Sequence, residues 1–103
     1  MSGIVELGKL PALHSVAISA ANAVKSLPLP VDCFGFRIYS PTADTKVYWA
    51  LESGQVASAT GKRRTIPAGS VGEVLHVKAL DGGTLYLTAS KAATIEVEVY
   101  ERA

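Results

Sequence analysis

The side chains that could support catalysis or metal binding are few and lie far apart in the sequence. The chain of 103 residues has two histidines, His14 and His76, and one cysteine, Cys33. Nucleophilic catalysis needs a base beside the nucleophile, and neither histidine belongs to a recognisable Ser or Cys nucleophile motif. A zinc site would need Cys, Asp or Glu ligands clustered with the histidines. The sequence therefore predicts a protein that is not an enzyme and uses no cofactor or metal.

Cys33 and a glycine pair have simpler structural interpretations. Cys33 stands beside Phe34 in an apolar segment, which favours a small buried hydrophobe over a reactive thiol. A lone cysteine forms no intrachain disulfide, as expected for a chain made in a reducing cytoplasm. Gly82-Gly83 follows Asp81 and precedes a strand-like segment without a lysine, so this segment indicates a turn and not a phosphate-binding loop.

The chain is nearly neutral overall and contains one compact run of basic residues. The net charge is +1, with 10 basic and 9 acidic residues, which disfavours nucleic-acid binding. The compact basic run Lys62, Arg63 and Arg64 has two interpretations: a solvated loop, or a contact with an acidic partner surface or phosphate.

Aromatic side chains form the last group with possible binding chemistry. Trp49 is accompanied by Tyr39, Tyr48, Tyr86 and Tyr100. Exposed rings of this kind would serve as stacking platforms for sugars. Alternation instead places Trp49 on the same face as Val47 and Leu51, which predicts core packing.

The elements that must position these residues have the two-residue period of β-strands. In the final segment, Thr94–Glu101, apolar residues alternate with carboxylates, which predicts Ile95, Val97 and Val99 facing inward and Glu96 and Glu98 in solvent. Further strands are expected at residues 14–19, 34–38, 46–51, 73–80 and 84–88. The second and third of this series, 34–38 and 46–51, are predicted to pair as a hairpin across a turn at 40–44.

Loops and turns separate these strands. Despite its alanines, residues 20–26 are expected to be a loop or a continuation of the preceding strand, because Leu27-Pro28-Leu29-Pro30 follows and its two prolines should prevent regular pairing. A long loop is expected at residues 54–61, and a turn at Ile66-Pro67-Ala68-Gly69.

Together these segments predict an all-β chain folded as an antiparallel β-sandwich, with a jelly-roll-like order as the leading candidate. Residues 14–103 are expected to form one domain, and residues 1–13 an extended N-terminal arm. Hydrophobic residues make up 49% of the chain and charged residues 18%, so either another subunit or partner covers some apolar surface, or alanine inflates the count. No stretch reaches the roughly 20 apolar residues of a membrane span.

The chain from Cys33 onward, about two-thirds of the total, also resembles a β-sandwich module of small tailed-bacteriophage virion proteins. The resemblance lies in the following motifs: Phe34-Gly35-Phe36-Arg37-Ile38, Val47-Tyr48, Ile66-Pro67-Ala68-Gly69, Thr84-Leu85-Tyr86 and the terminal Val-x-Val strand. It implies a head decoration or cement protein that binds the outside of the capsid and stabilises the lattice of the major capsid protein. The protein would then be made in the host bacterial cytoplasm and reside on the capsid exterior.

This resemblance also implies partners and contact residues. The expected partners are the major capsid protein and further copies of the chain, in a trimer or, next, a dimer, with no nucleic acid and no membrane. The first candidate contacts are the apolar residues of the arm, Ile4, Val5, Leu7 and Leu10, and the second are Lys62, Arg63 and Arg64. Two alternatives stay open: a tail- or fibre-associated structural protein, and a carbohydrate-binding module, which would require Trp49 or Tyr48 to be exposed.

Overall fold

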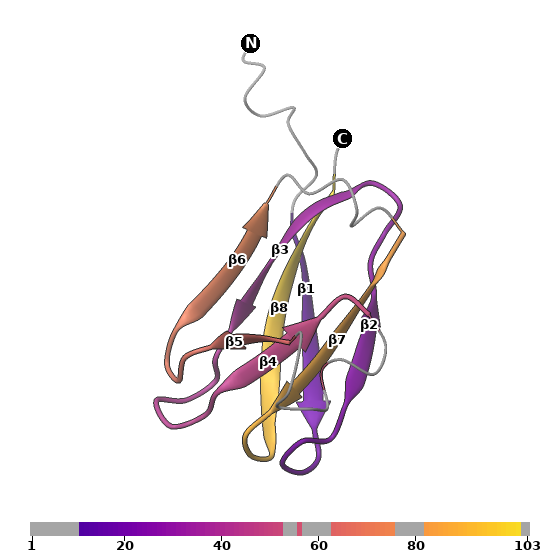
Figure 1. The fold of residues 1–103 in the computed structure, drawn as a ribbon. Helices are drawn as coiled ribbons and strands as arrows, with labels where there is room; N and C mark the ends of the chain where they lie inside the picture. The colour runs from indigo at the N-terminus through magenta and orange to yellow at the C-terminus, as the bar shows by residue number, and fades with distance from the viewer. Residues whose placement is uncertain (1–10, 53–55, 57–62, 76–81, 102–103) are drawn as a thin grey trace.

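The computed structural model describes residues 11–52, 56, 63–75 and 82–101. These residues form β-strands joined by turns and loops (Figure 1). The strands are β1 (Ala12–Ile18), β2 (Lys25–Pro28), β3 (Cys33–Tyr39), β4 (Val47–Ala50), β5 (Arg64–Ile66), β6 (Val71–Leu75), β7 (Thr84–Ala89) and β8 (Ala93–Glu101). The predicted all-β character is confirmed. The first strand starts at Ala12, slightly ahead of the expected start at residue 14, and the strand expected at 73–80 starts at Val71.

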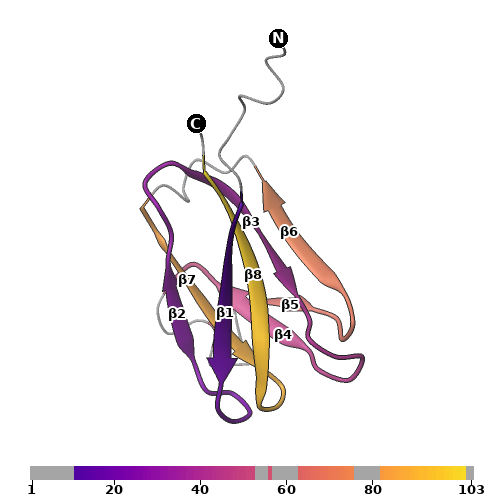
Figure 2. The same ribbon diagram turned by 180° about the vertical axis from the view of Figure 1, so that it is seen from behind.

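The strands form two four-stranded antiparallel sheets that pack face to face (Figures 1 and 2). The first sheet has the order β1-β8-β3-β6, and the second has the order β2-β7-β4-β5. The N-terminal strand therefore pairs with the C-terminal strand, in a register that runs from Ala12 opposite Val99 to Ile18 opposite Ala93. The predicted antiparallel sandwich is confirmed at this level.

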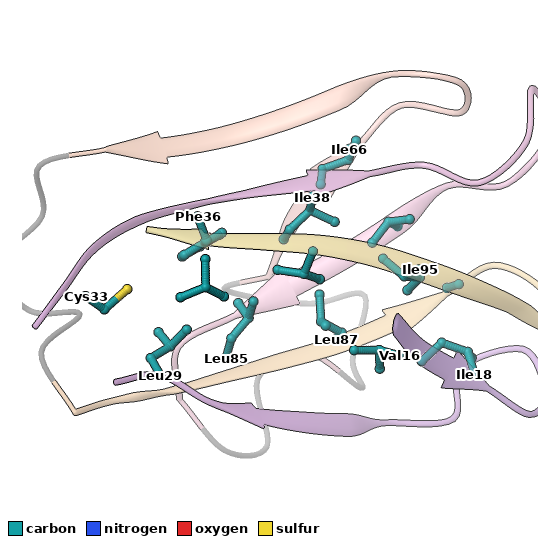
Figure 3. Packing of buried hydrophobic residues seen from close by; sticks show 14 residues of the cluster. Val16, Ile18, Leu29, Cys33, Phe36, Ile38, Ile66, Leu85, Leu87 and Ile95 are labelled. Carbon is teal, nitrogen blue, oxygen red and sulfur yellow. The ribbon is translucent and has the colours of Figure 1, made fainter. Parts of the chain in front are cut away.

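The core lies between the two sheets and takes large apolar side chains from both. Figure 3 shows Phe36, Ile38 and Ile95 from the first sheet near Leu85 and Leu87 from the second. All five are at most 1% exposed. A layer this closely packed excludes water from the apolar faces of both sheets, and this burial is the main term that holds the sheets together.

The final strand matches its sequence pattern. Ile95 and Val97 are 0% exposed and Val99 is 2% exposed, while Glu96 on the opposite face is exposed. Glu98 differs slightly from the expectation, because its side chain is only 20% exposed. The reason is local: neighbouring side chains on the same face of the sheet contact its carboxylate.

The predicted hairpin of residues 34–38 and 46–51 is wrong. β3 pairs with β6 and β8 in the first sheet, whereas β4 pairs with β5 and β7 in the second. The turn at 40–44 therefore carries the chain from one sheet to the other. Both strands bury apolar side chains, and these meet across the core instead of along a shared edge: the rings of Phe36 and Trp49 are T-shaped at 5.1 Å.

The expectation that prolines prevent pairing at 27–30 is also wrong. β2 pairs in regular antiparallel register with β7, with Leu27 opposite Leu85 and Pro28 opposite Thr84. Because β2 is an edge strand, a proline at its end is tolerated in a way that a central strand would not allow. The backbone amide of Leu29 then donates to the Gly83 carbonyl at 2.8 Å and continues the contact.

The turn predicted at Ile66–Gly69 is present. The Ser70 amide donates to the Pro67 carbonyl at 3.0 Å, and Gly69 has a φ of 75°, which a residue with a side chain adopts at a cost. The Gly69 amide also donates to the Ser40 hydroxyl at 3.0 Å. This turn is thereby joined to the segment that crosses between the sheets.

Candidate functional site

The predicted contact residues have different fates in the structure. The arm residues Ile4, Val5, Leu7 and Leu10 and the basic residue Lys62 lie outside the described residues. The remaining two members of the basic run, Arg63 and Arg64, are described and differ from each other.

The side chain of Arg63 is held against the protein surface by neighbouring residues of the same chain. Its guanidinium lies 3.6 Å from the centre of the Tyr48 ring, and its Nη1 donates to the Val56 carbonyl at 3.2 Å. The cation–π contact and the hydrogen bond leave Arg63 half-buried. Arg64, the first residue of β5, is exposed. Of these two arginines, only Arg64 presents its charge to solvent without such coverage.

The aromatic residues on β4 are both engaged. Trp49 packs against the core cluster and contacts Phe36, as its alternation with Val47 predicted. Tyr48 faces the opposite way, where Arg63 covers its ring. Neither ring is a free stacking platform.

The two sheets differ in how their outer faces are covered. On the second sheet, Ala50 faces away from the core together with Tyr48, yet Ala50 is 3% exposed and Tyr48 lies under Arg63. This outer face is therefore at least partly covered by the chain itself. On the first sheet, the outer face includes Glu96 and Leu13, both exposed.

A row of charged side chains crosses the outer face of the first sheet. The backbone register aligns Leu13, Glu98, Arg37 and Glu73, one from each of the four strands. Arg37 Nε donates to Glu73 Oε2 at 2.8 Å, and Arg37 Nη1 lies 3.8 Å from Glu98 Oε1. The Tyr39 hydroxyl also donates to the Glu98 carboxylate. We call Arg37, Tyr39, Glu73 and Glu98 the charged row.

Contacts in and beside the charged row shift the pKa values of Arg37 and Tyr100. Hydrogen bonds with Tyr39 and then with Glu73 raise the pKa of Arg37 above its already high ordinary value, so the arginine stays charged. Burial, followed by the negative charge of Glu98, raises the pKa of Tyr100. The Tyr100 ring lies 6.0 Å from the ring of Phe34. The face therefore combines aromatic rings with carboxylates.

Sequence reasoning did not identify the charged row. In the sequence, Arg37 and Tyr39 alternate with Phe36 and Ile38, and this pattern predicted only a strand. The partners could not be found, because the pairing predicted for this strand was wrong and the true neighbours β6 and β8 come from much later in the chain.

Two concavities lie beside the first sheet. A groove of about 330 Å³ is lined by Ala12, His14, Pro28, Leu29, Pro30, Val99 and Glu101. A smaller hollow of about 260 Å³ is lined by Tyr39, Ser40, Pro41, Thr94 and Glu96. The groove is mostly apolar and lies where the first strand starts and the second ends. His14 lines it and is itself exposed.

Within the part of the chain that the structure describes, no group of three or more His, Cys, Asp or Glu side chains is arranged to hold a metal ion. Cys33 is 0% exposed, and its Sγ lies 3.4 Å from the Gly35 carbonyl, as expected for a small buried side chain. Across the same described ranges, no helix is long and apolar enough to cross a membrane.

Comparison with known proteins gives no further constraint on identity. No protein-family model matches the chain, and no curated protein matches it significantly.

Proposed function

We propose that this chain is a structural virion protein that decorates the outside of a tailed-phage head and stabilises the major capsid protein lattice. The observation that carries the proposal is the strand order, β1-β8-β3-β6 facing β2-β7-β4-β5. We interpret this order as a jelly roll, in which the first strand pairs with the last and each strand crosses to the other sheet from the one before it, except β5, which pairs with β4. Jelly rolls are common in viral capsid proteins, and the motifs that resemble phage virion modules lie on these strands and turns.

The available surfaces support a role in binding. The outer face of the first sheet presents the charged row and the exposed side chain of Leu13. A repeated capsid lattice offers the same contact many times, so self-association of the chain would multiply modest individual affinities by avidity. A small sandwich that exposes this face is suited to the task.

Under this proposal the lattice contacts come from two places. Arg64 is exposed at the edge of the second sheet and is suited to an acidic patch on the capsid. The apolar arm residues Ile4, Val5, Leu7 and Leu10 form the other proposed contact, on the grounds of their sequence.

The carbohydrate-binding alternative loses its main support. It required an exposed Trp49 or Tyr48, whereas Trp49 packs against Phe36 and Tyr48 lies under Arg63. Association with a phage tail or fibre uses the same fold and is kept as an outcome of the test.

The test is co-sedimentation of the purified protein with heads and with tails prepared separately from the phage that encodes it. We expect saturable binding to heads. Arg64→Glu should weaken this binding, and Lys25→Glu, which reverses an exposed charge on the other edge strand of the same sheet, is the matched control. Binding to tails alone would replace the decoration role with the tail-associated one. Binding to neither particle would refute the virion proposal.

A further inference from the structure

The four edge strands of the sandwich differ in how they are protected against pairing. β1 and β6 border the first sheet, and β2 and β5 border the second. An edge strand exposes unpaired backbone N–H and C=O groups, and proteins usually protect it with charges, prolines, bulges or short length. Among the described strands, one of the four edges lacks all of these features.

Three edges are protected. β2 has four residues and includes Lys25 and Pro28, and β5 has three residues and starts with Arg64. β6 has five residues and carries Glu73, which pairs with Arg37. Charge, proline or short length therefore opposes the addition of another strand at each of these edges.

β1 has none of these devices. It is seven residues long, Ala12–Ile18, and contains no proline, lysine, arginine, aspartate or glutamate. Its register with β8 runs without a shift, so no bulge twists the edge away, whereas the pairing of β3 with β8 does shift. Leu13 is 70% exposed, more than Val71 on the opposite edge of the first sheet, which is 52% exposed. Figure 2 shows β1 at the margin of this sheet.

We infer that β1 is a self-association edge, on which β1 of a second copy pairs antiparallel about a two-fold axis at Ser15. The occupant is a second copy because the strand is self-complementary. With Ser15 on the axis, the large Leu13 lies opposite the small Ala17 of the second copy, and no like charges oppose each other. The pairing satisfies the free backbone groups, covers Leu13 and joins the two first sheets into one continuous sheet.

This inference stands apart from the proposed function, since it concerns the purified protein alone. It favours a dimer, which is the second of the two oligomers that the resemblance to phage proteins implies. A chain that dimerises through β1 and binds no phage particle would keep the inference and refute the virion role.

The first test compares two lysine substitutions at exposed apolar positions on opposite edges of the same sheet. Leu13→Lys places two like charges in the inferred interface, and Val71→Lys changes β6, where Val71 is 52% exposed. In sedimentation velocity over a concentration series, we expect the unsubstituted chain to be a dimer. Leu13→Lys should raise the dissociation constant of the dimer about tenfold or more. Val71→Lys should leave this constant unchanged. Circular dichroism checks that both variants stay folded.

The second test traps the register. In the inferred dimer the Cα atoms of Ser15 and its symmetry mate are separated by about 4.5–5.5 Å, within the usual disulfide range. Ser15→Cys should therefore form a disulfide-linked dimer on oxidation. Ala17→Cys is the matched control on the same face of the same strand, because its mate lies about 13 Å away along the strand. The native Cys33 is 0% exposed and does not compete.

Four results would overturn the inference. A monomer at every concentration would exclude the edge pairing, and so would a dimer that resists Leu13→Lys. A dimer dissociated by Val71→Lys would move the interface to β6. Cross-linking at Ala17 in preference to Ser15 would reject the two-fold axis at Ser15.

Discussion

At the residue scale, one exposed ion pair joins two turns that are distant in the sequence. Lys91 Nζ lies 2.7 Å from Asp44 Oδ2, and the Thr42 hydroxyl donates to Asp44 Oδ1 at 2.6 Å. The hydrogen bond from Lys91, followed by that from Thr42, lowers the pKa of Asp44 from 3.8 to about 2. The pair therefore links the crossing between β3 and β4 to the turn between β7 and β8.

The lowered pKa of Asp44 predicts a dependence of stability on pH. An aspartate whose pKa is lower in the folded state than in the unfolded state stabilises the fold at pH values above the unfolded-state pKa. This stabilisation is lost as the pH falls through the folded-state pKa. We expect the loss between the unfolded pKa of 3.8 and the folded pKa of about 2. Urea unfolding over this range should show a smaller decrease for Asp44→Asn than for the parent chain. Because the pair is exposed, high salt should reduce the difference.

Lys91→Met should reduce the same acid-dependent loss, since it removes the partner of Asp44. Lys25→Met removes an exposed lysine from β2 and is the control. Its free energy of unfolding should fall with decreasing pH as steeply as that of the parent chain. If the free energy of unfolding fell equally with decreasing pH for Asp44→Asn and for the parent chain, this ion pair would not contribute to folding stability.

The aromatic contact across the core gives a second prediction at this scale. Phe36 is 1% exposed and meets Trp49 edge-to-face, so Phe36→Ala removes a contact between the two sheets. We expect a loss of about 3–5 kcal/mol in the free energy of unfolding, measured by chemical denaturation. The neighbouring Phe34→Ala affects a half-buried ring and should cost clearly less. Similar losses for the two variants would contradict the assignment of Phe36 to the core.

At the element scale, the two margins of the sandwich are built differently. On the margin formed by β5 and β6, Ile66 is 2% exposed and its side chain packs where Gly72 has none. A Cβ at Gly72 would lie 2.7 Å from Ile66 Cδ1. On the opposite margin, where β1 and β2 lie, a groove of about 330 Å³ is found. The margin at β5 and β6 is thus filled by the Ile66 side chain, which needs the space left by Gly72. The margin at β1 and β2 instead contains a groove.

Gly72→Ala should therefore destabilise the closed margin. The added methyl group would displace Ile66 from its packed position, and such overpacking costs about 1–3 kcal/mol. Thermal and chemical unfolding measure the loss. Val71→Ala, at the adjacent exposed position, should change stability by no more than about 0.5 kcal/mol. A Gly72→Ala variant as stable as the parent would show that Ile66 adjusts without cost.

At the scale of the whole molecule, the last strand closes the fold. β8 lies between β1 and β3 in the first sheet and contributes Ile95, Val97 and Val99 to the core. The sandwich therefore cannot be completed until the C-terminal strand is available. Sheets with such distant pairing fold slowly compared with locally connected folds.

Two truncations test this dependence on the ends of the chain. Removal of residues 94–103 should abolish cooperative unfolding, because it removes a central strand. Removal of residues 1–10 ends before β1 and should leave the β-sheet circular dichroism spectrum and the cooperative transition in place. Loss of the cooperative transition in the second variant would show that the fold requires residues 1–10.

The sequence by itself determined the all-β class, the positions of most strands and the inward residues of β8. These features follow from local physics: a two-residue period selects the strand and its buried face, and glycine or proline selects the turn. The orientation of Trp49 and the burial of Cys33 were predictable for the same reason, since each follows from its immediate neighbours.

Only the tertiary structure decided which strands pair. β3 and β4 have the signature of a hairpin, yet each pairs with strands distant in the sequence, because their apolar faces meet across the core. Pro28 is accommodated because β2 lies at an edge, which no local pattern reveals. The charged row and the unprotected edge of β1 also depend on strand order. A side chain's alternation indicates its face, but its partners are set by the packing of the whole chain.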